Sequence, residues 1–530
     1  MKSKRTYFYN ALLMTAVTLL MRTVAVSFNV YLADRAGAEA MGLLSLVGSV
    51  YGFALTLATS GIHLATVRTV SEQMEKAGDV RRCLLTCLAY AAAFGTLASA
   101  ALFAFAKPIG LYLLRDARTV NGLFVLACSL LPIALTTVLN GYFTAVRRAY
   151  KNAVSQVTEQ AVKITLTVCL LRVILPNTVE GSLLAILAGG AAAESLSLIL
   201  NLILYAFDRR RHKPETTLEI APKTRAPIRV AAIALPVAVS AYMRSGLLAI
   251  EHILIPKGLS AYKQGTSAAL ASYGALHGMA LPVVLYPAAI LAAFAALLIP
   301  EVTRENAVRN EREIRYITGR VYQMTLLFSV GVAAVMLFLS DEFGTALYHN
   351  DEVSYFIRRL APLVPVMYLD TATDALLKGM GQQVYSMNVN ILDAFCSVLG
   401  VWLLVPRFGI AGYLATLYFT EILNAALSVS RLLRVSGYRP RPVRLLALPL
   451  LAAVGATALC RPLFCSVFRA FGNGASLALH VAAVALCYLL ILLVTGGLPF
   501  SDVKWLFSAL RPCDDTPGRS RRARLKVKNV

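Results

Sequence analysis

Charged residues are scarce in this chain of 530 residues. Asp, Glu, Lys and Arg together make up 15% of the sequence, whereas they make up about 25% of a typical soluble protein. Hydrophobic residues account for 58%, the mean hydropathy is +0.66, and no long polar stretch interrupts the apolar runs. This composition excludes an ordinary soluble globular protein and indicates one continuous unit embedded in a membrane.

Signatures of catalysis and of metal binding are also missing. The sequence contains no GxxxxGK[ST] phosphate-binding loop, no HExxH and no GxSxG. Its nine cysteines and six histidines are scattered, and Cys83 and Cys87, one helical turn apart, have no second pair to complete a metal site. We therefore expect no enzyme activity, no metal centre and no bound cofactor.

Apolar runs of membrane-spanning length, in contrast, recur from end to end. A spanning helix needs about 20 consecutive apolar residues. About fourteen such runs are present, at residues 6–32, 41–66, 83–106, 120–146, 152–171, 181–207, 230–255, 270–300, 321–339, 353–377, 385–405, 409–430, 445–460 and 475–498. The sequence thus predicts an all-α polytopic membrane protein with about 14 transmembrane helices.

Acidic residues are outnumbered, and the basic residues gather on one side of the predicted spans. The chain has 51 Lys and Arg against 28 Asp and Glu, a net charge of +23. Of the basic residues, 36 fall in the termini and the loops on the same side, whereas 12 fall in the opposite loops and at helix edges. The positive-inside rule therefore predicts that both termini are cytoplasmic. Because no soluble basic surface is predicted, nucleic-acid binding is not expected.

A basic, proline-containing segment separates two groups of six spans. We predict an N-terminal six-helix lobe at 1–207, a cytoplasmic basic linker at 208–229 and a C-terminal six-helix lobe at 230–434. Two additional helices (435–500) and a basic cytoplasmic tail (501–530) follow. The end of the tail, RSRRARLKVKNV, is suited either to anchoring the topology or to binding anionic lipid of the inner leaflet.

Two arginines fall near the middle of predicted spans, Arg22 in the first and Arg244 in the seventh. A fixed charge near the middle of a span costs about 2.5–3.5 kcal/mol and is usually kept for a function. Arginine remains charged at any working pH, and its planar fork matches phosphate. We expect both residues to bind an anionic substrate, a phosphate or diphosphate, in a membrane cavity; the alternative is an internal salt bridge to a carboxylate.

Polar residues in the seventh and eleventh spans form a second candidate site. Glu251 lies two helical turns after Arg244, and Asn390 and Asp393 lie in the eleventh span. A carboxylate near amide oxygens is suited to a small cation. These residues are candidates for coupling transport to Na⁺ or H⁺, although hydrogen bonding between helices would explain them equally well.

A third group consists of candidates for gating. Asp370, Asp374 and Lys378 follow one another at i, i+4 and i+8, which predicts either a gating element or an interfacial ladder of ion pairs. Pro282 and Pro287 fall inside the eighth span. Each removes a backbone hydrogen bond, so the helix bends there, as a static kink or as a moving part.

Three stretches resemble a known family. They are MGLLSLVGSVYGFALTLATSGIHLATVRTVSE (41–72), LHGMALPVVLYPAAILAAFAALLIPEVTRE (276–305) and LDTATDALLKGMGQQVYSMNVNILD (369–393). They are similar to the stage V sporulation protein B family, in the polysaccharide-transport branch of the multidrug/oligosaccharidyl-lipid/polysaccharide (MOP) exporter superfamily. The resemblance extends from about residue 5 to residue 435 and implies two six-helix lobes followed by two extra helices.

The resemblance also implies a function and a location. Its relatives include lipid II flippases, in which a central cationic cavity takes the head of an undecaprenyl-diphosphate-linked glycan and carries it to the outer leaflet by alternating access. The buried arginine of the first helix carries over to Arg22. The arginine that lipid II flippases have in helix eight has no counterpart in 270–300, so Arg244 is the expected substitute. The implied location is the bacterial cell membrane.

Two further functions remain open at this stage. An ion-coupled exporter of the multidrug-and-toxin-extrusion (MATE) kind would favour a cavity dominated by acids and aromatics, and seven acids do fall within the predicted spans. A membrane scaffold for envelope synthesis would make Arg22 dispensable. The leading prediction is a flippase for lipid II or a related cell-envelope polysaccharide precursor, whose partners are that substrate and the membrane lipids.

Overall fold

The computed structural model describes residues 2–75, 79–146, 148–173, 178–211, 226–262, 265–440, 447–466 and 473–497. Within these ranges the chain is nearly all helical and contains no strand. The predicted tail (501–530) and most of the predicted linker (212–225) lie outside the described residues.

The helices of the first half follow one another with short connections. They are α1 (Lys2–Thr59), α2 (Ile62–Glu75), α3 (Val80–Pro108), the π-helix η1 (Ile109–Leu113), α4 (Arg118–Ala145), α5 (Ala149–Val173) and α6 (Val179–Arg211). The Asp79 side chain caps α3 by accepting from the backbone N–H of Arg82.

The second half contains more interruptions. Its elements are α7 (Ala226–Ala261), α8 (Thr266–Tyr273), the π-helix η2 (Gly274–Ala280), α9 (Leu281–Leu285), α10 (Ala288–Ala307), α11 (Glu311–Phe338), α12 (Ser340–Tyr348), α13 (Asp351–Leu360), the 3-10 helix η3 (Ala361–Leu363), α14 (Val364–Gly379), α15 (Gln383–Phe408) and α16 (Ile410–Ser436). Two more helices follow, α17 (Leu448–Ser466) and α18 (Asn473–Val494).

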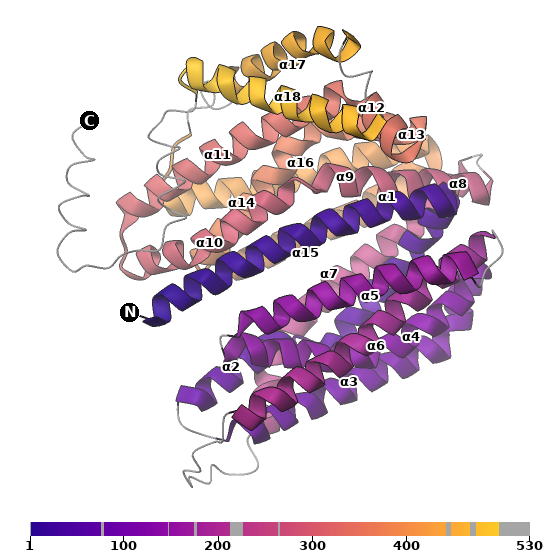
Figure 1. Ribbon diagram of the computed structural model, residues 1–530, viewed down its shortest axis with the longest axis vertical. Coiled ribbons are helices and arrows are strands. Elements are labelled where there is room, and N and C mark those ends of the chain that lie inside the picture. Colours follow the sequence, from indigo (N-terminus) through magenta and orange to yellow (C-terminus); the bar gives the residue numbers. More distant parts are fainter. Residues whose placement is uncertain are drawn as a thin grey trace.

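The helices lie in two groups with α1 and α7 between them (Figure 1). Helices α2–α6 form one group, and α8–α16 form the other. Helix α7 packs against α15 of the second group and also touches α1 and α2. Helices α17 and α18 pack on each other and on α11, where the Tyr488 hydroxyl donates to the carbonyl of Leu327 at 2.8 Å.

Helix α1 joins the first two predicted spans almost without a loop. The backbone of Gly37 has φ 80° and ψ 169°, a conformation that glycine adopts readily and that breaks the helix. The start of α1 and the following α2 lie at the same end of the molecule (Figure 1), so the chain reverses direction at Gly37. The second span is broken again at Ser60 and Gly61, both with positive φ.

The backbone of α1 touches that of the second group of helices close to Gly37. A Cβ atom on Gly42 of α1 would overlap the carbonyl oxygen of Leu270 in α8, and one on Gly274 would overlap the carbonyl oxygen of Ala38. Only residues without a side chain permit this approach, as in other close helix contacts in membranes. We refer to Ala38–Gly42 and Leu270–Gly274 as the glycine seal.

The described residues contain eleven helical stretches long and apolar enough to cross a membrane, compared with the fourteen runs in the sequence. Three runs account for the difference: the first two merge into Ala16–Met74, the run 152–171 in α5 is not among the eleven, and the apolar part of α17 is short, Leu448–Cys460. The segment 340–352, which lies between two predicted spans, is largely helix α12. Burial raises the pKa of Glu342 there, because α12 packs against the protein.

Candidate functional site

Arg22 lies in α1, on the part of the helix that runs between the two groups (Figure 1). Its side chain is exposed. Because a charge facing hydrocarbon is costly, we expect the guanidinium to face water or a ligand rather than lipid. Among the described residues, no carboxylate lies within ion-pair distance of Arg22.

The residue after Arg22 links α1 to the broken eighth span. The hydroxyls of Thr23 and Tyr286 are hydrogen-bonded at 2.8 Å. Tyr286 caps α9, and the next residue, Pro287, caps the start of α10, so the proline lies at a break in the span. Pro282 lies in the first turn of α9, directly after η2. The sequence indicated the bends but gave no sign that Thr23 and Tyr286 meet.

Arg244 lies in α7 and is also exposed. It interacts electrostatically with Asp370 of α14 and Asp393 of α15. Neither carboxylate comes within ion-pair distance, and the described part of the chain provides no other acid that does. The guanidinium is therefore attracted to two acids yet retains its donors for a ligand.

Four acids from four helices lie close together beside Arg244. Glu251 of α7, which is 7% exposed, interacts with Asp393, and Glu421 of α16 interacts with Asp393, Asp370 and Glu251. The hydroxyl of Ser397 is a hydrogen-bond partner of Glu251. We call Glu251, Asp370, Asp393 and Glu421 the acid cluster. The structure thus brings Glu251 and Asp393 together, and adds Asp370 and Glu421.

Amide and hydroxyl groups provide hydrogen-bond partners for only some of the polar atoms near the acid cluster. Asn424 of α16 donates to Oδ2 of Asp370 at 3.4 Å, and Ser428 lies beside the same carboxylate. Oδ1 of Asp370 is buried and has no hydrogen-bond partner among the described residues. Asn390 donates to the carbonyl of Ser386 in its own helix at 2.8 Å, which leaves its side-chain oxygen as the available donor atom for a cation.

Asp374 and Lys378 form an ion pair of 2.7 Å on the surface of α14. The hydroxyl of Ser386 also donates to Asp374. This geometry fits the ion-pair alternative for these two residues. Asp370, which we grouped with them because of its spacing, is also a member of the acid cluster.

A buried group of histidine and tyrosine rings adjoins Glu251. His252 Nδ1 lies 2.8 Å from the hydroxyl of Tyr273, and the rings of His252 and His277 lie 4.8 Å apart. His277 lies in η2, and its ring is 5.4 Å from that of Tyr413 in α16. These residues lie in different helices without a shared motif, so sequence reasoning could not group them.

The first half contains a smaller polar group. Ser197 of α6 donates to Glu159 of α5 at 2.8 Å, and Glu194 interacts electrostatically with Glu159 and Lys163. Within the described ranges no three His, Cys, Asp or Glu side chains gather as a metal site.

Comparison with known proteins decides the family. Residues 8–300 match the family model described as "Polysaccharide biosynthesis protein". The chain belongs to this family. Arg22, Arg244, Glu251, Pro282 and Pro287 lie inside the match, and the other predicted site residues lie after it.

Relatives outside the family model extend the similarity over nearly the whole chain. Stage V sporulation protein B of Bacillus subtilis (strain 168) is 24% identical over 510 residues, which cover 93% of this chain and 96% of that protein. Sporulation protein YkvU of the same organism is 21% identical over 358 residues, 67% of this chain and 78% of its own. The resemblance seen in the sequence is therefore confirmed.

Solved structures of transporters share the fold. The lipid II flippase MurJ in an inward closed conformation has a TM-score of 0.66 and 13% identity, covering 91% of this chain and 98% of its own. A MATE family transporter of the MOP superfamily, in an inward-facing conformation, has a TM-score of 0.61 and 14% identity, covering 81% and 98%. The predicted MOP exporter-like fold of this family member is confirmed.

Proposed function

We propose that this protein is a flippase that moves an undecaprenyl-diphosphate-linked glycan from the inner to the outer leaflet of the cell membrane. The substrate would be lipid II or a related precursor of a cell-envelope polysaccharide. The observation that carries the proposal is the pair of exposed arginines, Arg22 and Arg244, which lie within membrane-spanning helices and have no ion-pair partner among the described residues.

The chemistry of such a substrate explains why arginines are needed. A diphosphate-sugar head cannot enter hydrocarbon, because burying an unpaired charge there is prohibitive. Guanidinium groups replace the hydration of the phosphates with paired, directional hydrogen bonds. The polyprenyl chain, being apolar, remains in lipid while the head moves between the two groups of helices.

The glycine seal fits the inward-facing stage of this cycle. It holds the two groups together at the end of the molecule where Gly37 lies, away from the start of α1. With the N-terminus in the cytoplasm, as the excess of basic residues in the inner loops indicates, the seal is at the outer end. Opening it, and closing the inner end, would present the substrate to the outer leaflet.

The acid cluster supplies a means of coupling. Asp393 interacts with Glu251 and with Asp370, and Arg244 interacts with both Asp370 and Asp393. Binding Na⁺ or H⁺ would neutralise their repulsion, and a substrate anion near Arg244 would compete with the acids for its charge. Glu251, Asn390 and Asp393 therefore remain our candidates for ion coupling.

Binding to lipid II tests the proposal. Purified wild type and Arg22→Ala would be compared by native mass spectrometry, with Arg81→Ala, an exposed arginine at the start of α3, as a matched control. We expect the wild type and Arg81→Ala to retain lipid II and Arg22→Ala to lose at least about tenfold in affinity, equivalent to about 1.4 kcal/mol.

The result also separates the alternative function. If Arg22→Ala binds lipid II as well as the control does, the assignment of Arg22 is wrong. If the wild type binds no lipid II but retains organic cations, the acid cluster is the substrate site, and the MATE-like exporter replaces the flippase. The MATE family structures share this fold, so the fold does not decide between the two.

A further inference from the structure

A cationic groove lies beside the start of α11, away from the acid cluster. It has a volume of about 740 Å³ and is lined by nine residues from two segments, 312–323 in α11 and 437–439 directly after α16. Four of the nine are arginines (312, 315, 320 and 439), and none is acidic. Two of the others are tyrosines, 316 and 438. We call this the arginine groove.

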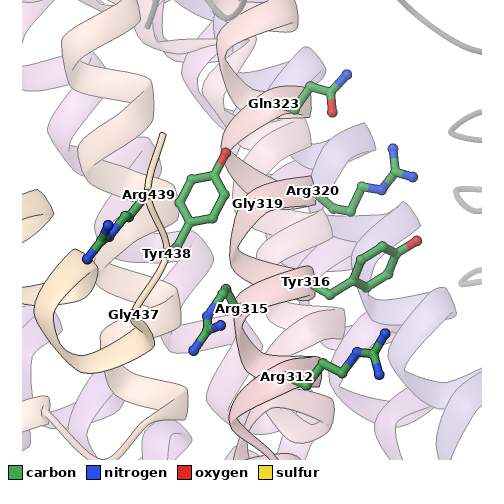
Figure 2. A pocket seen from close by; sticks show the side chains of 9 residues that line it. All are labelled: Arg312, Arg315, Tyr316, Gly319, Arg320, Gln323, Gly437, Tyr438 and Arg439. Atoms are coloured by element: carbon green, nitrogen blue, oxygen red, sulfur yellow. The ribbon is translucent and has the colours of Figure 1, made fainter. Parts of the chain in front are cut away.

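Two glycines allow the segments to come together. Gly437 ends α16 in a left-handed conformation, φ 64°, which turns the chain back towards α11. The ring of Tyr438 then lies directly over Gly319, where a Cβ atom would be only 2.8 Å from Cε2 of the ring. The groove is thus formed by packing of particular residues, with Gly319 at its base (Figure 2).

Cationic and aromatic side chains stand on both sides of this base. Arg312, Tyr316 and Arg320 project on one side of α11, at i, i+4 and i+8 (Figure 2). The guanidinium of Arg320 lies 5.3 Å from the centre of the Tyr316 ring. Arg315 and Arg439 lie on the other side, beside Tyr438 (Figure 2).

Three of the four arginines in the groove are not neutralised by a carboxylate of the described residues. Arg312, Arg315 and Arg439 are exposed, and no carboxylate of the described residues lies within ion-pair distance of them. Several guanidinium groups gathered without a carboxylate repel one another, and an anion that bridges them relieves this repulsion.

The position of the groove relative to the membrane indicates which kind of anion it binds. The uninterrupted apolar part of α11 begins after Arg320, at residue 321. At 1.5 Å per residue, Arg315 lies about 9 Å and Arg312 about 13.5 Å outside that boundary along the helix axis. The headgroup layer on each side of a bilayer is roughly 5–8 Å thick. Arg320 and Arg315 therefore lie on either side of the level of the lipid phosphates, which the long side chain of Arg312 approaches from the water.

We propose that the arginine groove binds the phosphate of an anionic membrane lipid, such as phosphatidylglycerol, in the inner leaflet. The assignment to the inner leaflet rests on the predicted topology, whereas lipid binding itself does not depend on the transported substrate. The phosphate would bridge Arg315 of α11 to Arg439, so that the bound lipid fixes the end of α16 against the start of α11, and Arg312 would add positive charge from the other side of the helix. This site is separate from Arg22.

A double variant with a matched control tests the proposal. Arg312→Gln/Arg315→Gln removes two guanidinium groups from the groove, and Arg81→Gln/Arg82→Gln removes two exposed ones from the start of α3. Each full-length protein would be titrated with phosphatidylglycerol in nanodiscs of phosphatidylcholine, with retained lipid counted by native mass spectrometry and unfolding temperature recorded.

We expect the groove variant to bind phosphatidylglycerol at least tenfold more weakly than the wild type and the control variant. It should retain the wild-type unfolding temperature in phosphatidylcholine alone, which confirms that it folds, and should still bind lipid II. Equal retention of phosphatidylglycerol by both double variants would overturn the proposal. Arg439→Gln alone, on the opposite side of the groove, should weaken the same binding.

Inorganic phosphate distinguishes the two sources of the ligand. If millimolar phosphate displaces phosphatidylglycerol and raises the unfolding temperature of the wild type as much as the lipid does, the groove is a site for a soluble phosphate and the lipid assignment is wrong. We expect no such displacement. Loss of lipid II binding in Arg22→Ala with intact phosphatidylglycerol binding would show that the two sites are independent.

Discussion

For the arginines, the sequence predicts which residues matter but not how their side chains are placed. The position of Arg22 in an apolar run identified it as a candidate, because an intramembrane charge is rarely kept without a function. The sequence could not tell that its side chain is exposed, or that Thr23 bonds Tyr286 beside it. Those facts depend on how α1 packs on the second group of helices.

Carboxylates show the same division. Spacing along one helix correctly paired Asp374 with Lys378, because residues four apart lie on the same face. Spacing cannot report contacts between helices, so Glu421 and Asn424 were not recognised as neighbours of Asp370. The acid cluster requires four helices to converge, and only the structure contains that information.

Asp208 provides a prediction about stability at the level of one residue. It is 3% exposed, and it pairs with Arg148 and, at 2.6 Å, with Lys151, while the Tyr142 hydroxyl donates to it at 3.1 Å. Asp208→Asn removes the carboxylate charge that pairs with both cations where α4, α5 and α6 meet. Removing one partner of a buried pair costs about 3–5 kcal/mol.

The unfolding temperature in detergent, at a fixed heating rate, measures this effect. We expect Asp208→Asn to unfold several degrees below the wild type. Glu72→Gln is the control, since it breaks an ion pair with the largely exposed Arg68 and such surface pairs contribute about 0–1 kcal/mol. Similar small changes in both variants would contradict our reading of Asp208.

Helices were predicted well where apolar runs are long and poorly where backbone geometry matters. The runs identified most of the spans, but the merging of the first two at Gly37 was not foreseen. Helix α12 was not predicted either, because it lies between two of the apolar runs. In both cases the local backbone, rather than the hydrophobic composition of the segment, determines where a helix begins or ends.

The glycine seal gives a prediction at the level of helices. Gly42→Ala inserts a methyl group against the Leu270 carbonyl, whereas Gly48→Ala, in the same helix, meets no atom within 4 Å. Overpacking costs typically about 1–3 kcal/mol. That amount shifts an equilibrium about tenfold for each 1.4 kcal/mol. We therefore expect Gly42→Ala to favour a state that is open at the outer end.

Labelling of Leu270→Cys, in a cysteine-free background, reports this opening. Leu270 is 2% exposed when the seal is closed, so an impermeant maleimide added outside should react slowly. In combination with Gly42→Ala the reaction should be at least tenfold faster, and in combination with Gly48→Ala it should be unchanged. Equal rates in the two combinations would mean that the seal does not control access.

The whole molecule was easiest to classify from the sequence. Hydropathy, the excess of basic residues and three resembling stretches were sufficient for the MOP exporter-like fold, because the bilayer allows few architectures. The arginine groove was not foreseen, since it joins residues more than a hundred positions apart in sequence. Which molecule the protein transports likewise depends on how side chains from different helices come together.

The proposed ion coupling would involve the whole molecule and gives a further prediction. In proteoliposomes, transport by the wild type should respond to an imposed Na⁺ or H⁺ gradient. Asp393→Asn should still bind lipid II but lose that response, because one charge of the acid cluster is gone. Asp374→Asn, whose partner is Lys378, should keep it. A gradient response that survives in Asp393→Asn would remove this residue from the coupling site.

The near absence of a loop at Gly37 has a consequence for biosynthesis. With one non-helical residue between them, the first two spans cannot be released into the bilayer far apart in time or space. They would leave the insertion machinery together as a hairpin, so the apolar second span can compensate for the insertion cost of Arg22 in the first. Gly37, which ends the first span, thus also lowers the free-energy cost of inserting a charged first helix.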